Sequence, residues 1–269
     1  MAPLADFLVS QLPEVNLPIY LTKYIPGQTP FSTLPTVVLT LAGYLVTIFS
    51  IQHAMKDMKP YKLTPLFRAH NAFLTFGSGL LLLLIAEEII PIWYQKGLHD
   101  AMCAAPSWTP RLEFYYMINY SFKYIELIDT VFLALKKKPL AFLHVFHHSA
   151  TAALCFSQLN GKTSVSWVPI VLNLGVHVVM YYYYYATAGG AKIWWKKYLT
   201  SMQITQFVID LVGIYYAAYH HFVTGSCAGT PTAALSGVAL LTSYLFLFVD
   251  FYIRTYNAPK GAKKAVKTE

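Results

Sequence analysis

Three histidines stand at positions 144, 147 and 148, near the start of an apolar stretch long enough to be buried in a membrane. Positions i, i+3 and i+4 of a helix share one face, so we expect His144, His147 and His148 to point into one site. Placing imidazole in hydrocarbon costs free energy, and ionisable groups found there mark functional sites. The cluster therefore predicts acid–base, nucleophilic or metal-binding chemistry inside a membrane.

The composition is that of a membrane protein. Of 269 residues, 56% are apolar and 12% are charged, which is about half the charged fraction of soluble domains. Seven stretches have about the 20 residues needed to cross the hydrocarbon; they are 32–51, 66–90, 113–135, 140–159, 165–186, 198–221 and 232–256. The third and fourth are the least apolar. We expect an all-α polytopic membrane protein with seven transmembrane helices.

One membrane domain is expected over residues 32–256, between an N-terminal lumenal segment (1–31) and a basic cytosolic tail (257–269). The first segment is Pro-rich and lacks a basic start followed by a short apolar run, so no cleavable signal peptide is expected. Fifteen of the twenty Lys and Arg residues fall on one side of the predicted helices. This bias predicts a cytosolic C-terminus and a lumenal N-terminus.

The net charge of +8 is spread over separate loops. It indicates affinity for anionic lipid or an anionic substrate, and it argues against nucleic acid as a partner. Cys103 and Cys227 both fall in loops assigned to the lumen, where oxidising conditions allow a disulfide. The alternative is a pair of unpaired thiols. The third cysteine, Cys155, lies within a helix.

Other helices add polar side chains at the depth of the histidines. They are Lys123, Glu126, Asp129 and Thr130 in the third helix, Asn173, His177, Met180 and Tyr181 in the fifth, and Gln203 and Gln206 in the sixth. Because alternate helices run in opposite directions, all of these fall in the cytosolic half. We predict a polar chamber that opens to the cytosol and continues as an apolar channel.

Structural roles stay open for some of these residues. Lys123 and Glu126 are three residues apart and can neutralise each other, and Gln203, Gln206 and Asp210 can hold helices together. The tyrosine run 182–185 is typical of an interfacial aromatic belt. His53 and His70 are expected in or near the cytosolic loop.

Three kinds of chemistry fit the chamber to different degrees. A di-iron centre needs about eight histidines in several boxes, and only four lie at this depth. A single zinc ion held by His144, His148 and His177 remains an alternative. Acyl transfer fits better, because imidazole acts as general base or nucleophile and the basic rim attracts an anionic thioester such as a CoA ester. A seven-helix receptor or transporter would instead disperse its polar residues along a path.

Six motifs occur in a fixed order along the chain. They are Lys-Pro-Tyr at 59–61, Asn71, Lys123-x-x-Glu126-x-x-Asp129-Thr130, Phe142-Leu143-His144-x-x-His147-His148, Asn173-x-x-x-His177-Val178-x-Met180-Tyr181 and Gln203-x-x-Gln206-Phe207. In this order they resemble the ELO family of very-long-chain fatty acid elongases of the endoplasmic reticulum. The stretch from Lys136 to Gln206 is similar to the fungal branch.

The resemblance implies a fold and a reaction. Helices two to seven would form a barrel around an acyl tunnel, with helix one outside. An acyl-CoA would condense with malonyl-CoA to give a 3-ketoacyl-CoA two carbons longer, CO2 and CoA, with no cofactor and no metal. The resemblance also implies the ketoreductase, dehydratase and enoyl reductase of the elongation cycle as partners, together with the lipid bilayer, and it is compatible with a homodimer.

By the same resemblance, His147 would carry the acyl group in a ping-pong mechanism, with His144, His148 and His177 managing protons and decarboxylation. A single-step condensation with histidine only as base is the alternative. Asn173, Gln203 and Gln206 are candidates to stabilise the enolate or oxyanion. Site-shaping roles fall to Lys123, Glu126, Asp129, Thr130, Met180 and Tyr181.

Overall fold

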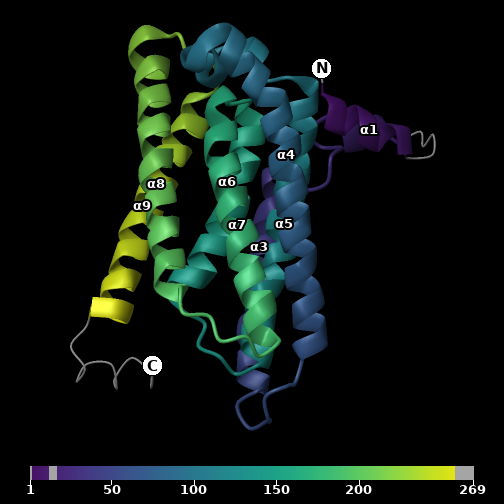
Figure 1. Ribbon diagram of the computed structural model, residues 1–269, viewed down its shortest axis with the longest axis vertical. Helices are drawn as coiled ribbons and strands as arrows, with labels where there is room; N and C mark the ends of the chain where they lie inside the picture. The colour runs from purple at the N-terminus through teal and green to yellow at the C-terminus, as the bar shows by residue number, and fades with distance from the viewer. Residues whose placement is uncertain (1, 12–16, 258–269) are drawn as a thin grey trace.

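The computed structural model describes residues 2–11 and 17–257, and all regular structure within these ranges is helical. The helices are α1 (Pro3–Gln11), α2 (Ile19–Thr22), α3 (Leu34–Ala54), α4 (Thr64–Cys103), α5 (Pro110–Leu135), α6 (Phe142–Gly161), α7 (Trp167–Ala188), α8 (Lys196–Tyr219) and α9 (Pro231–Tyr252). The seven from α3 to α9 run up and down along the long axis of the molecule (Figure 1). The predicted tail, 257–269, lies outside the described residues except for Asn257.

Local sequence explains where several of these helices begin. A proline stands at the first or second position of α3, α4, α5 and α9, where its missing N–H has no helical partner to lose. The side chains of Thr109 and Thr230 cap α5 and α9 by accepting the backbone N–H groups of Leu112 and Ala233.

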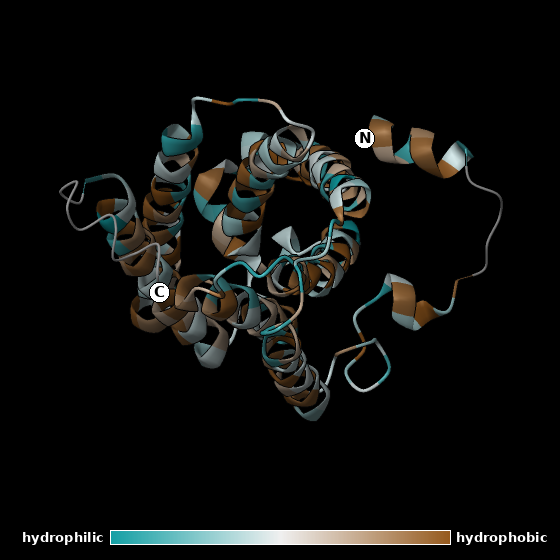
Figure 2. Ribbon diagram, turned by 90° about the horizontal axis from the view of Figure 1, so that it is seen from below, coloured by the Kyte–Doolittle hydropathy of each residue, from teal (hydrophilic) through white to brown (hydrophobic). Residues whose placement is uncertain are grey.

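Six helices pack in a closed order of neighbours: α4, α7, α8, α9, α6, α5 and back to α4. Helix α3 lies outside this order, against α5 and α6. The view along the bundle shows the helices nearly end-on, with α1 and α2 beside them (Figure 2). Helix α6, which carries the three histidines, is thus held between α5 and α9.

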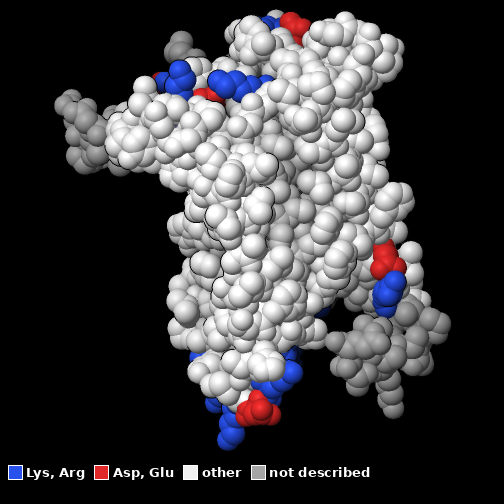
Figure 3. All heavy atoms as spheres, turned by 180° about the vertical axis from the view of Figure 1, so that it is seen from behind, with Lys and Arg blue, Asp and Glu red and all other residues white. Residues whose placement is uncertain are grey.

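Four helical segments are long and apolar enough to cross a membrane: Leu34–Ala54, Thr64–Cys103, Ser164–Ala188 and Pro231–Asn257. Their outer faces expose large apolar side chains such as Leu39, Phe76 and Phe246. On the face shown in Figure 3, charged side chains gather toward the two ends. The chain is therefore a polytopic membrane protein. Helices α5, α6 and α8 are long enough to span but carry more polar residues, so the count of seven spans stays a prediction.

Helix α4 is longer than the predicted stretch 66–90. It continues to Cys103 across a kink at Gly97, whose φ of 82° suits glycine. The prediction stopped too early because it followed hydropathy, whereas the helix goes on through the more polar residues 91–96. The extension delivers Cys103 to the end of the bundle opposite the three-lysine loop 136–138.

The N-terminal segment is tied to that same end. Backbone N–H groups of Leu4 and Ala5 donate to the carboxylate of Glu87, and the N–H of Tyr24 donates to Glu113. Burial raises the pKa of the Tyr24 hydroxyl to about 12, and Asn160 donates a hydrogen bond to its oxygen. These contacts attach residues 2–31 to the membrane helices within the ranges that the structure describes.

Candidate active site

Loops 55–63, 136–141 and 189–195 lie at one end of the helix bundle, which we call the basic end. A chamber lies at this end. The volume open to the centre of a water molecule is about 280 Å³. The predicted residues that line it are Asp129, His144, His147, His148, Asn173, His177, Met180, Gln203 and Gln206. The other four lie behind this wall. Lys123, Thr130 and Tyr181 hydrogen-bond to it, and Glu126 lies within ion-pair distance of His177. The prediction of one polar chamber built from four helices is consistent with this geometry.

His144 and His148 face each other one turn apart on α6, with ring centroids 4.4 Å apart. His144 Nε2 lies 3.0 Å from Thr130 Oγ1, and Tyr44 donates its hydroxyl to the same oxygen at 2.7 Å. Tyr44 comes from α3, outside the closed order of helices. The outer helix therefore helps to fix the orientation of a chamber histidine.

His147 is surrounded by aromatic rings from two later helices. Its ring packs against Tyr244, Phe248 and Phe207, with centroids 4.8, 5.6 and 6.3 Å away. Its Nδ1 is buried and has no hydrogen-bond partner among the described residues. An imidazole held by ring contacts, with a nitrogen left free, is suited to act as a base or nucleophile.

Lys123 is the centre of a buried polar chain behind the histidines. Its ammonium donates to both oxygens of Glu126, at 3.0 and 3.3 Å, and to Asn173 Oδ1 at 2.8 Å. The Asn173 amide donates to His177 Nε2 at 3.2 Å. His177 Nδ1 lies 3.3 Å from Glu126 Oε1, close enough for electrostatic attraction but without hydrogen-bond alignment. The expected Lys123–Glu126 pair is present, and it also orients two residues of the chamber.

Asp129 joins three helices. One carboxylate oxygen accepts the Tyr181 hydroxyl at 2.9 Å, and the other lies 2.8 Å from His70 Nε2. His70 lies in the first two turns of α4, near the cytosolic loop as expected, but its side chain is mostly buried. Only the packing of α4 on α5 reveals this role. A polar signal existed in the sequence, where His70 is followed directly by Asn71.

The aromatic and glutamine predictions need one correction and one addition. Tyr184 belongs to the run 182–185 that was read as an interfacial belt, yet it also lines the chamber, about one turn along α7 from Tyr181. Gln203 donates to Met180 Sδ at 3.5 Å, whereas Gln206 donates to Asp210 Oδ2 at 3.0 Å. The two glutamines therefore have different partners.

A second, inner cavity begins where the chamber ends. His147, Asn173, Gln206 and Phe207 line both spaces. The inner cavity extends between helices toward the opposite end, with about 70 Å³ open to water centres. A third, smaller cavity follows, and it shares Gln158, Ile214 and Gly237 with the second. The three spaces thus form a series from the basic end to the opposite end, with His147 at the first junction.

Two cations at the basic end lie over aromatic rings. Lys136 is half-buried over the ring of Phe67, 3.6 Å from its centroid. Burial, and then the charge of Lys138, lowers the pKa of the Lys136 ammonium. Arg68 lies over the ring of Tyr185 at 4.5 Å. Phe67 lines the chamber, so Lys136 and the neighbouring Arg68 place positive charge beside it, which favours an anionic ligand there.

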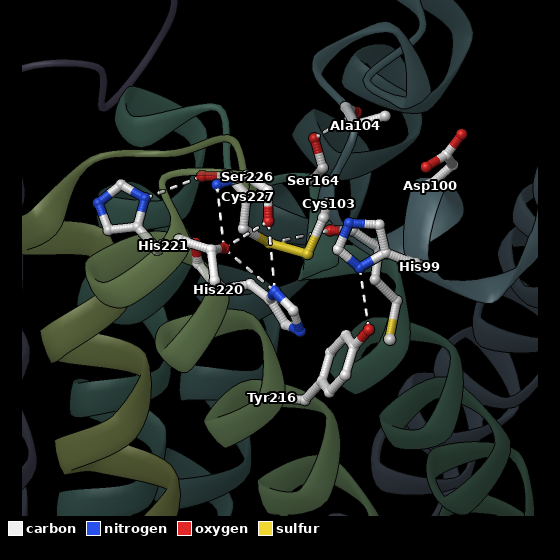
Figure 4. The surroundings of a disulfide bond; sticks show 12 residues. His99, Asp100, Cys103, Ala104, Ser164, Tyr216, His220, His221, Ser226 and Cys227 are labelled. Atoms are coloured by element: carbon white, nitrogen blue, oxygen red, sulfur yellow. Dashed lines mark hydrogen bonds between the residues drawn. A yellow bond between two sulfur atoms is a disulfide. The ribbon is translucent and has the colours of Figure 1, made fainter.

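At the opposite end, Cys103 and Cys227 form a disulfide across 124 residues (Figure 4). The backbone reinforces the connection, because the N–H of Ala228 donates to Cys103 O at 2.8 Å. His221 Nδ1 lies 2.9 Å from Cys227 O, and His99 Nδ1 lies 2.9 Å from the Tyr216 hydroxyl. These histidines are far along the bundle from the chamber.

No group of three His, Cys, Asp or Glu side chains is arranged to hold a metal ion in the part of the chain that the structure describes. His144 and His177 are already engaged by Thr130 and Asn173. The zinc alternative therefore has no geometric support among these residues.

The fold and the site define an all-helical, polytopic membrane protein with a histidine-lined chamber joined to an apolar cavity. Residues 29–264 match the family described as ELO: GNS1/SUR4 family. The chain belongs to this family.

The sequence is similar to named fatty acid elongases over most of its length. It is 48% identical to "Putative fatty acid elongase 1" of Schizosaccharomyces pombe over 251 residues, which is 90% of this chain and 75% of that protein. It is 37% identical to "Fatty acid elongase A" of Dictyostelium discoideum over 243 residues, 88% of each chain. It is 30% identical to "Very long chain fatty acid elongase 4" of Homo sapiens over 262 residues, 88% of this chain and 74% of that protein.

Proposed function

We propose that this chain is a fatty acid elongase that condenses a long-chain acyl-CoA with malonyl-CoA, giving a 3-ketoacyl-CoA two carbons longer, CO2 and CoA. Family membership and the names of the relatives support fatty acid elongation. The observation that carries the condensation chemistry is the position of His147, which lines both the chamber and the inner cavity. A thioester carbonyl at this junction has the acyl chain on one side and the CoA moiety on the other.

The proposed division of space follows charge and polarity. The cations of the basic end suit the phosphates of CoA, and the largely apolar inner cavities suit an acyl chain. The closed order of six helices and the series of three cavities support a barrel around an acyl tunnel, with α3 outside. No cofactor beyond the two CoA substrates is part of the proposal.

In the ping-pong mechanism, an imidazole nitrogen of His147 attacks the thioester carbon. The C–S bond breaks, CoA leaves as the thiol after taking a proton, and an acyl-imidazole remains. Malonyl-CoA then loses CO2, and the electron pair of the broken C–C bond forms an enolate. The enolate carbon attacks the acyl carbon, the C–N bond breaks, and the leaving imidazole nitrogen takes up one proton, which restores the neutral imidazole.

The surrounding residues assist these steps. His144, His148 and His177 exchange protons and stabilise the charge that develops on malonyl-CoA. Their partners Thr130, Asn173 and Glu126 hold two of these rings in place, which is what preorganised electrostatic stabilisation requires. In the alternative single-step condensation, His147 acts only as a base and no acyl-enzyme forms.

The test is incorporation of radiolabelled malonyl-CoA by the purified protein across a panel of acyl-CoAs. We expect labelled 3-ketoacyl product from the wild type, none above background from His147→Ala, and normal product from His53→Ala, whose histidine is exposed on the basic-end side of α3. Absence of product with every acyl chain would overturn the proposal. Mass spectrometry of the wild type incubated with acyl-CoA alone distinguishes the mechanisms, because only ping-pong leaves an acyl group on His147.

We place the protein in the endoplasmic reticulum membrane, with its N-terminus in the lumen and its C-terminus in the cytosol. The distribution of Lys and Arg supports this orientation, and the Cys103–Cys227 disulfide supports an oxidising compartment at the opposite end. The ketoreductase, dehydratase and enoyl reductase that complete the cycle are the proposed protein partners. Accessibility of single engineered cysteines to an impermeant thiol reagent in sealed microsomes tests the orientation.

A further inference from the structure

The inner cavity contains polar atoms that the proposed condensation does not use. Asn119 Oδ1, Ser166 Oγ and Asp210 Oδ1 are buried and have no hydrogen-bond partner among the described residues. The three side chains line the same cavity, and their residues are 2%, 3% and 0% exposed. They come from α5, from the turn before α7, and from α8. We call these three residues the polar belt.

The polar belt lies beyond the reaction site, along the path proposed for the acyl chain. Asn119 is four residues from Lys123 and Asp210 is four residues from Gln206, so each lies about 6 Å farther from the chamber at 1.5 Å per residue. Ser166 is seven residues from Asn173, or about 10 Å by the same rise. The belt is therefore deeper than His147 and near the middle of the inner cavity.

An unsubstituted hydrocarbon chain does not satisfy these atoms. It would cover the free oxygens of Asn119 and Asp210 with methylene groups and exclude the water that could otherwise bind them. A buried polar atom without a hydrogen bond raises the free energy of the complex, and a buried carboxyl group does so most. The polar belt therefore disfavours binding of an unsubstituted acyl chain at its depth in the cavity.

The chemistry of the free atoms indicates the complementary ligand. The amide oxygen of Asn119 is an acceptor, and so is the Asp210 oxygen when its carboxyl is ionised. The Ser166 hydroxyl can donate or accept. A hydroxyl group donates one hydrogen bond and accepts another, so it can bind an acceptor and Ser166 together. A ketone has no donor, and an ammonium group carries a much larger desolvation cost.

We propose that the polar belt is a subsite for a hydroxyl group in the middle of the acyl chain, so that hydroxyacyl-CoA thioesters are substrates. This inference rests on the proposed elongase function. An extended chain covers roughly 1.2 Å per bond, so a depth of about 6 to 10 Å places the hydroxyl about five to eight bonds from the thioester carbonyl. Hydroxyl groups outside that window miss the belt.

The experiment compares one saturated acyl-CoA with its positional hydroxy isomers, using the full-length protein in lipid nanodiscs. The measured quantity is kcat/KM for incorporation of radiolabelled malonyl-CoA, with the hydroxyl moved carbon by carbon along the chain. We expect a maximum in the window, about tenfold above the plain chain, as for one hydrogen bond to a buried acceptor. Asp210→Leu and Asn119→Leu should lower the ratio of kcat/KM for the hydroxy isomers in the window to kcat/KM for the plain chain, so that the maximum disappears whatever the absolute rate of each variant.

Two further variants keep the test decisive. Asp210→Asn retains a polar group at the same place, which a hydroxyl can pair with as donor or acceptor, and should retain the maximum. Ser157→Ala is the matched control on α6, because that hydroxyl is engaged with Ser236 and Leu154 and does not line the cavity. If Asp210→Leu does not fold, Asn119→Leu and the wild-type scan decide.

The outcomes separate the two proposals. Elongation of the plain chain with no maximum for any hydroxy isomer overturns the polar belt and leaves the elongase function intact, and it assigns the free atoms to ordered water. A maximum that persists in both leucine variants also overturns it. Absence of product from every chain, plain or hydroxylated, overturns the elongase function instead.

Discussion

His70 Nε2 lies 2.8 Å from Asp129 Oδ1, which connects α4 to α5 directly behind the chamber. The second oxygen of Asp129 accepts the Tyr181 hydroxyl, so α7 joins the same carboxylate. One side chain thus fixes the relative positions of three helices whose residues build the site. Asp129 also contributes to the chamber wall, and its partners hold its orientation.

Tyr181→Phe should lower stability and activity together. It removes a hydrogen bond to a buried carboxylate, a loss of about 1.5–3 kcal/mol, and it frees Asp129 to rotate. Thermal unfolding in detergent and malonyl-CoA incorporation measure the two effects. Tyr182→Phe is the control, because Tyr182 is 53% exposed whereas Tyr181 is fully buried. Equal midpoints for the two variants would contradict the assigned role.

Lys123→Met should be among the most destabilising substitutions in the chain. It leaves the buried Glu126 carboxylate without its main partner, which costs about 3–5 kcal/mol. Replacing both partners, Lys123→Met with Glu126→Leu, should restore much of the lost stability but not activity, because Asn173 and His177 lose the groups that orient them. Denaturant unfolding of the single and double variants measures the coupling energy.

The exposed pair Asp250–Arg254 is the control for that cycle. Its side chains are 53% and 71% exposed, and its 2.8 Å contact is of similar length to the buried one. Removing either partner should change stability by about 0–1 kcal/mol. Comparable losses for the exposed and buried pairs would show that burial does not determine the cost.

Gly161→Ala should destabilise the contact between α6 and α9. A Cβ at Gly161 would stand 2.5 Å from Ala233 Cβ and 2.8 Å from Thr230 Oγ1, so one helix must shift. Overpacking of this kind costs about 1–3 kcal/mol. Gly43→Ala in α3 has nothing within 4 Å and should be neutral or gain up to about 1 kcal/mol of helix propensity. Unfolding midpoints of the two alanine variants should therefore move in different directions or by clearly different amounts.

Replacing Cys103, Cys227 or both should lower the free energy of unfolding by the same amount, because each change removes the same disulfide. Cys103→Ser and Cys227→Ser each release a crosslink that spans 124 residues, and each should cost about 2–4 kcal/mol. The double variant should match either single one, because the bond is already absent. Additive losses, or a wild-type unfolding midpoint that does not respond to reductant, would contradict this prediction.

The positions of the long helices could be predicted because hydropathy and proline placement are local signals. The shared face of His144, His147 and His148 was equally local. Contacts between helices were not predictable in the same way. His70 was expected near the loop, where it lies, but nothing in its neighbourhood shows that α5 presents Asp129 to it. Tyr184 was assigned to a belt because a run of four tyrosines does not reveal which of them faces inward.

The extension of α4 past residue 90 shows a further limit. Hydropathy falls there, yet backbone hydrogen bonding continues until Gly97 adopts a positive φ. The aromatic contacts of His147 are with Phe207, Tyr244 and Phe248, which come from two later helices. Long-range packing of this kind determines which histidine meets both cavities.

The packing of α4 against α7 has a consequence for biosynthesis. Gly79 of α4 lies against Val178, and a ribosome makes two intervening helices before it reaches that residue. Until then, the side of α4 that is covered in the finished protein, including the wholly buried Ser78, has no α7 to pack on. The contact between α4 and α7 therefore forms only after α5 and α6 have been made.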